Sequence, residues 1–161
     1  MTGRTAEPPV GVTMVPIGMV ASPRSALVDD DWGEVEATIT LHAPYSERSL
    51  VGLDQFSHVE VLFLFDRVDP TSVHTGVRVP RANPRWPEVG IFAQRGKDRP
   101  NRIGLCTCQL VTVDGPRLTV RGLDAVDGTP VLDLKPYLAE FGPRGPVVQP
   151  QWAHELMARY F

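Results

Sequence analysis

Four stretches of the chain hold polar, glycine and proline residues more densely than packing alone requires: residues 17–23, 52–58, 92–105 and 124–137. Glycine allows a backbone to approach a ligand closely, and proline fixes the geometry of a turn. These stretches are therefore where we expect a binding or catalytic site.

Residues 92–105 hold the basic side chains best suited to bind a ligand. Their sequence is Phe-Ala-Gln-Arg-Gly-Lys-Asp-Arg-Pro-Asn-Arg-Ile-Gly-Leu. An arginine guanidinium presents a planar fork that fits a carboxylate or a phosphate. The stretch is not a P-loop, because neither Ser nor Thr follows its Gly-Lys pair. It predicts a site for an anionic ligand, and a solvated basic hairpin tip stays open as the alternative.

Residues 124–137 add a second pattern, in which the Asp-Gly-Thr-Pro turn of residues 127–130 offers a carboxylate, a hydroxyl and amides. Asp133 and Lys135 alternate with leucines, so both should face the same side of a strand. They predict either a plain surface ion pair or a pair that moves a proton or orients a substrate beside Tyr137.

Two further pairs favour structural roles. Ser57 and His58 invite a hydrolase interpretation, but no Gly-x-Ser-x-Gly elbow surrounds them. Neighbours on a strand point to opposite faces, so we expect no hydrogen bond between them, and His58 should be a structural or pocket-wall histidine. Cys106 and Cys108 would share one strand face, which suits neither a disulfide nor a four-ligand zinc site. Buried reduced thiols and no metal centre are expected.

A β framework is expected to hold these residues. Apolar patterns predict short strands over residues 15–20, 35–41, 59–65, 89–93, 102–113, 118–123 and 131–134. Residues 49–56 should form a short helical connection, and Asp114-Gly115 indicates a hairpin. With 16 prolines and 14 glycines, the chain favours a mainly β fold, a small single β-barrel with a short C-terminal helix.

The helix is expected after Pro150, with Trp152, Leu156 and Tyr160 on one face. It is too short to be stable alone, so it must dock on its own barrel or on a partner. The expected organisation is a flexible tail over residues 1–14, a barrel domain over residues 15–138 and an extension over residues 139–161.

Composition and charge exclude several classes of protein. The 161 residues suit one domain, and the longest apolar run, residues 61–65, is far shorter than the roughly 18 residues of a membrane span. Without a signal-peptide core, a cytoplasmic protein that meets no membrane is expected. The net charge of −3 argues against a general polyanion binder. Residues 78–102 nevertheless hold seven Lys or Arg against two acids, which either gather an anionic ligand or balance the acidic residues 29–31.

Taken in order, the four stretches resemble the TsaA-like (TrmO-type) family over about residues 15–138. The specific motifs are Arg-Pro-Asn-x-Ile-Gly at residues 99–104 and Asp-Gly-Thr-Pro-Val-Leu-Asp-x-Lys-Pro-Tyr at residues 127–137. The resemblance implies a β-barrel that binds S-adenosylmethionine, usually as a homodimer, and N6-methylates threonylcarbamoyladenosine next to the tRNA anticodon. A methyltransferase acting on a small metabolite and a non-catalytic S-adenosylmethionine-binding regulatory module stay open as alternatives.

By motif, the resemblance implies cofactor contacts after the buried strand, in the basic turn, at its exit and in the Asp-Gly-Thr-Pro turn. These residues are Asp66, Arg67, Arg95, Leu105, Asp127, Gly128, Thr129 and Pro130. The Pro-Arg-Gln-Pro-Gly segment frequent in the family is replaced here by residues 31–33, Asp-Trp-Gly. Trp32 is therefore expected to stack on the cofactor where an arginine contact is missing.

The reaction implied by the resemblance needs help for a poor nucleophile, since a urea-like nitrogen attacks slowly without a base or a group that stabilises its anion. The candidate catalytic residues are Asp133, Lys135 and Tyr137, with Asn101 orienting. The candidate substrate-binding residues are His58, Lys97, Arg99 and Arg102. Their segment would contact tRNA phosphates, with a steep dependence on salt.

Overall fold

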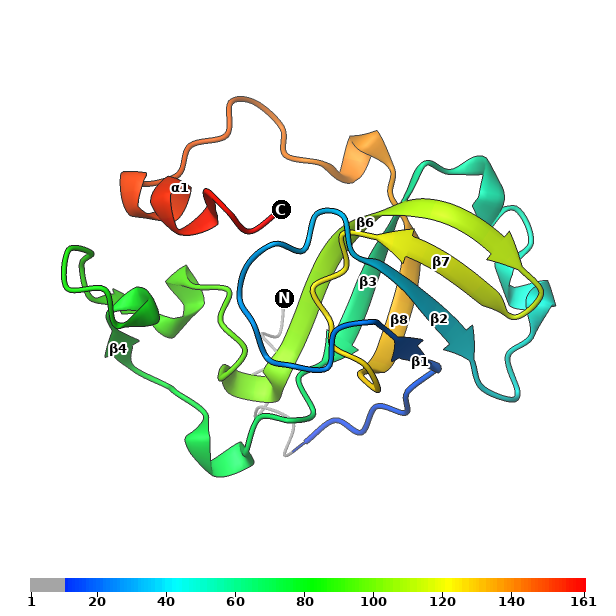
Figure 1. Cartoon of the computed structure of the whole chain (residues 1–161), viewed down its shortest axis with the longest axis horizontal. Helices are drawn as coiled ribbons and strands as arrows, with labels where there is room; N and C mark the ends of the chain where they lie inside the picture. Colours follow the sequence, from blue (N-terminus) through cyan, green and yellow to red (C-terminus); the bar gives the residue numbers. More distant parts are fainter. Residues whose placement is uncertain (1–10) are drawn as a thin grey trace, which may run out of the picture.

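The computed structural model describes residues 11–161, and its main element is a closed barrel, on the right in Figure 1. Six antiparallel strands close it in the order β1-β2-β7-β6-β3-β8. The strands are β1 (Gly18–Ala21), β2 (Glu36–Leu41), β3 (His58–Leu64), β6 (Ile103–Asp114), β7 (Arg117–Arg121) and β8 (Pro130–Pro136). The expected mainly β barrel is confirmed, whereas most of the expected flexible tail lies outside the described residues.

The barrel interior follows the period of two that the sequence predicts. Val59, Val61 and Phe63 of β3 are buried, and the first two lie opposite Cys108 and Cys106 of β6. Both thiols are buried and free, as expected. The neighbouring Cys106 thiol and burial raise the pKa of the Cys108 thiol, so it stays protonated and packs as a small apolar group.

An arm, residues 65–102, leaves the barrel between β3 and β6. It contains β4 (Val77–Arg78) paired with β5 (Val89–Gly90), and the 3-10 turns η3 (Pro70–Ser72), η4 (Pro80–Ala82), η5 (Ile91–Ala93) and η6 (Pro100–Arg102). The strand expected over residues 89–93 is wrong beyond Gly90. Its partner β4 is only two residues long, so the ladder ends and the chain turns into η5.

The C-terminal helix α1 (Gln151–Met157) lies beside the arm and away from the barrel (Figure 1). Three further 3-10 turns are η1 (Glu47–Leu50) and η2 (Leu53–Gln55), where a helical connection was expected, and η7 (Ala139–Phe141). The Trp86 indole N–H donates to Glu155 Oε2 at 2.7 Å, which joins the arm to α1. Across residues 11–161, no helix has the length and apolar character needed to cross a membrane.

Candidate functional site

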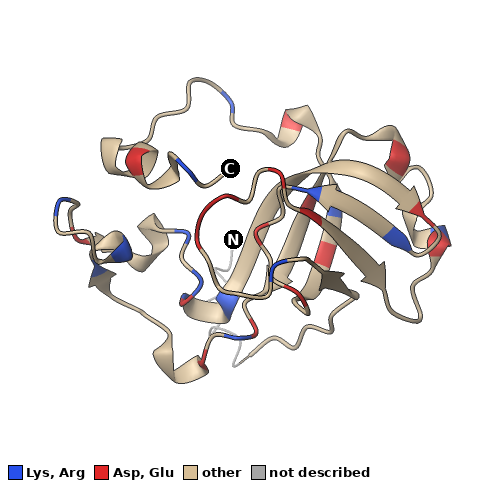
Figure 2. Ribbon diagram, viewed as in Figure 1, with Lys and Arg blue, Asp and Glu red and all other residues tan. Residues whose placement is uncertain are grey.

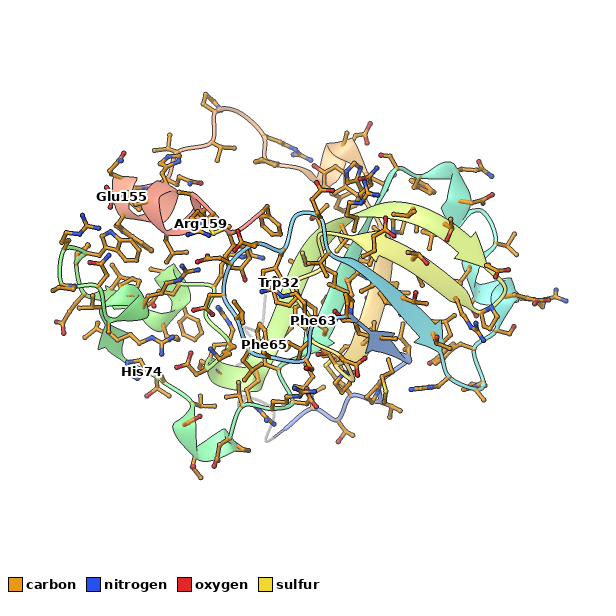
Figure 3. The ribbon with its side chains drawn as sticks, in the orientation of Figure 1. Trp32, Phe63, Phe65, His74, Glu155 and Arg159 are labelled. Carbon is orange, nitrogen blue, oxygen red and sulfur yellow. The ribbon has the colours of Figure 1, made fainter. Side chains whose placement is uncertain are left out.

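A cleft of about 1370 Å³ opens where the barrel meets the arm. Its walls come from β3 and β6, from the arm, from the loop of residues 22–34, from residues 124–129 and from the C-terminal segment, residues 149–161. Figure 3 shows Trp32, Phe63 and Phe65 grouped between the barrel and the arm. The cleft therefore gathers segments that are far apart in the sequence.

One part of the cleft lining is apolar and exposed to solvent. Phe92 is 77% exposed, Phe161 is 62% exposed and Leu105 is 42% exposed, although all three lie in a concave site. Large apolar groups left uncovered in a cavity are typical of a ligand-binding surface. The lining suits a ligand with a planar or aliphatic part.

Arginines of the cleft are held by backbone carbonyls. Arg95 Nη2 donates to the Leu105 carbonyl at 2.6 Å, and Arg99 Nη1 donates to the Gln94 carbonyl at 2.7 Å. Arg67 donates to the carbonyls of Ser25, at 2.6 Å, and Asp127, at 2.8 Å. A carbonyl positions a guanidinium without cancelling its charge, so these groups keep their affinity for an anion.

Two other arginines of the arm are neutralised inside the fold. Arg78 forms an ion pair with Asp98, and this guanidinium holds the pKa of the Asp98 carboxyl below its usual range. Arg81 pairs with Asp30 at 2.9 Å, which ties the arm to the acidic loop. Figure 2 shows the blue segments of the arm and the red segment of that loop. The acidic loop thus balances part of the basic segment, and the carbonyl-held arginines and Lys97 remain for a ligand.

The structure brings most of the expected cofactor residues to the cleft. Those that line it are Trp32, Asp66, Arg67, Arg95, Leu105 and Thr129. The other three expected residues, Asp127, Gly128 and Pro130, do not line the cleft. The Asp127 carboxylate accepts the Ser22 N–H at 3.0 Å, and Pro130 starts β8 opposite Met19. These residues shape the turn that presents Thr129.

Trp32 is buried at the cleft wall, with an exposed fraction of 3%. Its indole N–H donates to the Val28 carbonyl at 3.2 Å, and the Arg24 guanidinium lies 4.0 Å from its ring centroid. An arginine therefore already covers one face of the indole. Stacking of Trp32 on a cofactor stays a prediction that concerns the remaining ring surface.

The expected catalytic and substrate residues divide into two groups. Asn101, Lys97 and Arg99 line the cleft. His58, Asp133, Lys135 and Tyr137 lie outside it, on or beside the paired strands β3 and β8, where the Tyr137 N–H donates to the His58 carbonyl at 3.0 Å. Arg102 also lies outside the cleft, and its guanidinium donates to the Val68 carbonyl at 2.8 Å.

Asp133 and Lys135 match the geometry of the plain surface pair. Lys135 Nζ lies 2.8 Å from Asp133 Oδ2, with side chains 58% and 42% exposed respectively. The Asp133 carboxylate raises the pKa of the Lys135 ammonium. In this chain alone, neither group reaches the cleft where a substrate would lie.

Ser57 and His58 correct one expectation. Ser57 Oγ lies 2.7 Å from His58 Nδ1, so the two side chains are within hydrogen-bond distance. The expected absence of a hydrogen bond is wrong because β3 begins at His58, so Ser57 precedes the strand and the alternation of strand faces does not apply to the pair. Both residues are exposed and lie outside the cleft.

Comparison with known proteins bears on these motifs. Residues 20–142 match the model of the tRNA-methyltransferase O N-terminal domain. The chain belongs to the TrmO family. This TrmO-family chain is 43% identical over 104 residues to human tRNA (adenine(37)-N6)-methyltransferase, covering 65% of this chain and 23% of the human one. The enzyme of the same name from Escherichia coli K12 is 38% identical over 138 residues, covering 76% and 56%.

Two other matches of this TrmO-family chain bear on fold and length. A crystal structure of TrmO from Pseudomonas aeruginosa aligns with a TM-score of 0.67 at 31% identity, covering 81% of this chain and 58% of that one. A probable S-adenosyl-L-methionine-binding protein from Methanothermobacter thermautotrophicus is 34% identical over 134 residues, covering 81% and 93%. The chain thus spans under two thirds of the tRNA methyltransferases but nearly all of the archaeal protein.

The sequence did not mark Asp124, Tyr160 or Phe92 as site residues, although all three line the cleft. The Tyr160 hydroxyl donates to Asp124 Oδ2 at 2.7 Å. Burial and the Asp124 carboxylate raise the pKa of Tyr160, so it remains a donor. The spacing of Trp152, Leu156 and Tyr160 indicated a docking face, but nothing in the sequence showed which surface it meets.

Proposed function

We propose that this TrmO-family chain binds S-adenosylmethionine in the cleft and uses it to N6-methylate threonylcarbamoyladenosine next to the tRNA anticodon. The observation that carries the proposal is the pairing of carbonyl-held arginines with an exposed apolar wall in one cavity. Relatives with the same domain carry the name tRNA (adenine(37)-N6)-methyltransferase, which supports the choice of acceptor.

The donor groups present fit the parts of S-adenosylmethionine. Arg95 suits its carboxylate, Asp66 suits a ribose hydroxyl pair, and the apolar wall at Leu105 and Phe92 suits its adenine. When bound, the cofactor supplies an electrophilic methyl group whose sulfonium leaves without a general acid. The residues of this chain therefore act mainly by positioning, and Asn101, which lines the cleft, is our candidate to orient the acceptor.

Calorimetric titration with S-adenosylmethionine tests the cofactor site. We expect wild-type protein to bind with micromolar affinity. Arg95→Ala should bind about 10-fold or more weakly, because it loses a charged hydrogen bond worth about 1.5–3 kcal/mol. Arg117→Ala, an exposed change on β7 outside the cleft, is the matched control and should bind as the wild type does. Absence of binding by the wild-type protein would refute the proposed cofactor.

A second candidate function is binding of S-adenosylmethionine without transfer. The observation that favours it is the archaeal match over 93% of its length, to a protein named for binding alone. Labelled cofactor incubated with tRNA that carries threonylcarbamoyladenosine separates the two candidates. Label in tRNA supports the enzyme, whereas cofactor binding without transfer to any acceptor supports the binding module.

A further inference from the structure

The C-terminal helix contributes a wall to the cleft. Trp152, Leu156 and Met157 of α1 all line it, although α1 lies outside the matched residues 20–142. Trp152 and Leu156 are four residues apart and therefore share one helix face. This wall therefore lies outside the part of the site that the family match covers.

The wall is anchored at two points. Within the second half of α1, Glu155 accepts the Trp86 indole N–H of the arm at 2.7 Å. Beyond the end of the helix, the Tyr160 carbonyl accepts the Trp32 backbone N–H at 2.8 Å, and the Tyr160 hydroxyl donates to Asp124. Because these contacts fix the helix, its cleft-facing side chains are held ready for a ligand.

Trp152 is an aromatic residue of this wall, and its indole N–H has no hydrogen-bond partner among the described residues. The indole N–H groups of Trp32 and Trp86 each donate to a protein acceptor. Within residues 11–161, the half-buried Trp152 makes no such bond. Phe92, 77% exposed, lines the same cleft from the arm. Two aromatic residues on different walls of one cavity favour a planar ligand.

The cavity also has room for more than one ligand group. Its volume of about 1370 Å³ exceeds the roughly 300–1,000 Å³ of an ordinary small-molecule site. Lys97 and Arg99 line it and can neutralise a phosphate or carboxylate attached to a planar base. Aromatic surface beside fixed cations is the combination that binds nucleotides without base-edge readout.

We propose that Trp152 forms a stacking subsite for the purine base of a nucleoside-containing ligand. The inference rests on the proposed function, because the base belongs either to S-adenosylmethionine or to the tRNA acceptor. Stacking of one base on an aromatic ring changes affinity by about 5-fold to more than 100-fold, which is a measurable effect.

The test compares single variants of the full chain, two at Trp152 and one control. Trp152→Leu keeps apolar bulk, so α1 can still dock, but removes the aromatic face. Trp152→Phe keeps an aromatic face. His154→Ala, an exposed change that lies outside the cleft lining, is the matched control. Hydrogen exchange over residues 151–161 checks that the helix stays docked in each variant.

Each variant is titrated with S-adenosylmethionine in one experiment and with tRNA, at saturating S-adenosylhomocysteine, in a second experiment. We expect Trp152→Leu to weaken binding about 5-fold or more in one of the two titrations, and Trp152→Phe and His154→Ala to stay within about 2-fold of wild type. Weaker binding of S-adenosylmethionine assigns the base to the cofactor, and weaker binding of tRNA assigns it to the acceptor.

Unchanged affinity of Trp152→Leu in both titrations, with the helix docked and the wild type binding normally, would overturn the proposed subsite. An equal loss in Trp152→Phe would do the same, because stacking would then not be the cause. A wild-type protein that fails to bind S-adenosylmethionine is a different result, since it removes the proposed function itself.

Discussion

At the scale of single residues, the backbone at the cleft edge is held in an uncommon conformation. Asn101 has φ 63° and Arg102 has φ 50°, both in the left-handed region. Asparagine tolerates this region better than most residues, and such strain clusters at functional sites. The strained turn places Asn101 in the lining and turns Arg102 toward the Val68 carbonyl.

The variant Asn101→Gly distinguishes the role of the Asn101 amide from the effect of its positive φ on backbone stability. Glycine accepts a positive φ, so the melting temperature should change little, while loss of the amide should slow methyl transfer about 10-fold with cofactor affinity retained. Single-turnover transfer and calorimetry measure the two effects. Unchanged transfer would mean that the amide does not orient the acceptor.

Asp133→Asn serves as the companion variant, because Asp133 was a candidate base and lies outside the cleft. If each copy of the chain works on its own, Asp133→Asn leaves transfer and cofactor binding unchanged, because Asp133 does not line the cleft of its own copy. Loss of transfer with intact binding would show that Asp133 acts as proposed from the sequence, brought to the cleft by a second copy.

At the scale of elements, the C-terminal segment makes polar contacts with separate parts of the chain. Its backbone pairs with the loop at residues 31–32, and Tyr160 reaches Asp124 after the end of β7. Asp124 Oδ1 is buried and has no partner among the described residues, so Tyr160 supplies the one hydrogen bond of that carboxylate within them. The segment and Asp124 therefore stabilise each other.

Tyr160→Phe should loosen this segment without unfolding the barrel. Removing the hydroxyl leaves Asp124 without its donor, at a cost of about 1–3 kcal/mol. Faster hydrogen exchange confined to residues 151–161 would show the effect. Arg159→Ala, which removes a largely exposed ion pair with Asp31, is the control and should change little.

The same contact sets an expected pH dependence. Burial and Asp124 raise the pKa of Tyr160 above its ordinary value of 10.0. The stability that the neutral hydroxyl contributes is thus fully present below pH 10.0 and declines only as the pH rises beyond it. Exchange at residues 151–161 that quickened between pH 7 and pH 9, after correction for the intrinsic rate, would contradict this.

At the scale of the whole molecule, the expected site residues lie on two surfaces. The cleft holds one set, and the strands β3 and β8 carry His58, Asp133, Lys135 and Tyr137 outside it. A dimer, which the family resemblance implies, could bring the second surface of one copy to the cleft of another. Oligomeric state therefore decides whether the two sets act together.

Sedimentation at micromolar concentration measures this directly. We expect a dimer, with or without S-adenosylmethionine. A monomer that binds the cofactor with normal affinity would exclude a site shared between subunits, and the residues on β8 would then be surface groups.

The sequence by itself determined the barrel and the family. Alternation in residues 35–41, the apolar run of residues 59–65 and the Asp114-Gly115 hairpin are local patterns whose period sets strand and face. The Arg-Pro-Asn-x-Ile-Gly and Asp-Gly-Thr-Pro motifs were readable for the same reason, because each is contiguous. The family resemblance implies cofactor contacts for Arg95, Leu105 and Thr129, and all three line the cleft.

Only the tertiary structure decided how distant segments meet. The pairing of β8 with β3 leaves Asp133 and Lys135 outside the cleft, and the two-residue length of β4 ends β5 at Gly90. The docking of Tyr160 on Asp124 joins residues 36 positions apart, through one hydrogen bond that no local pattern encodes. A sequence specifies which face a residue takes within its element, whereas the packing of elements across the cleft depends on the closed barrel as a whole.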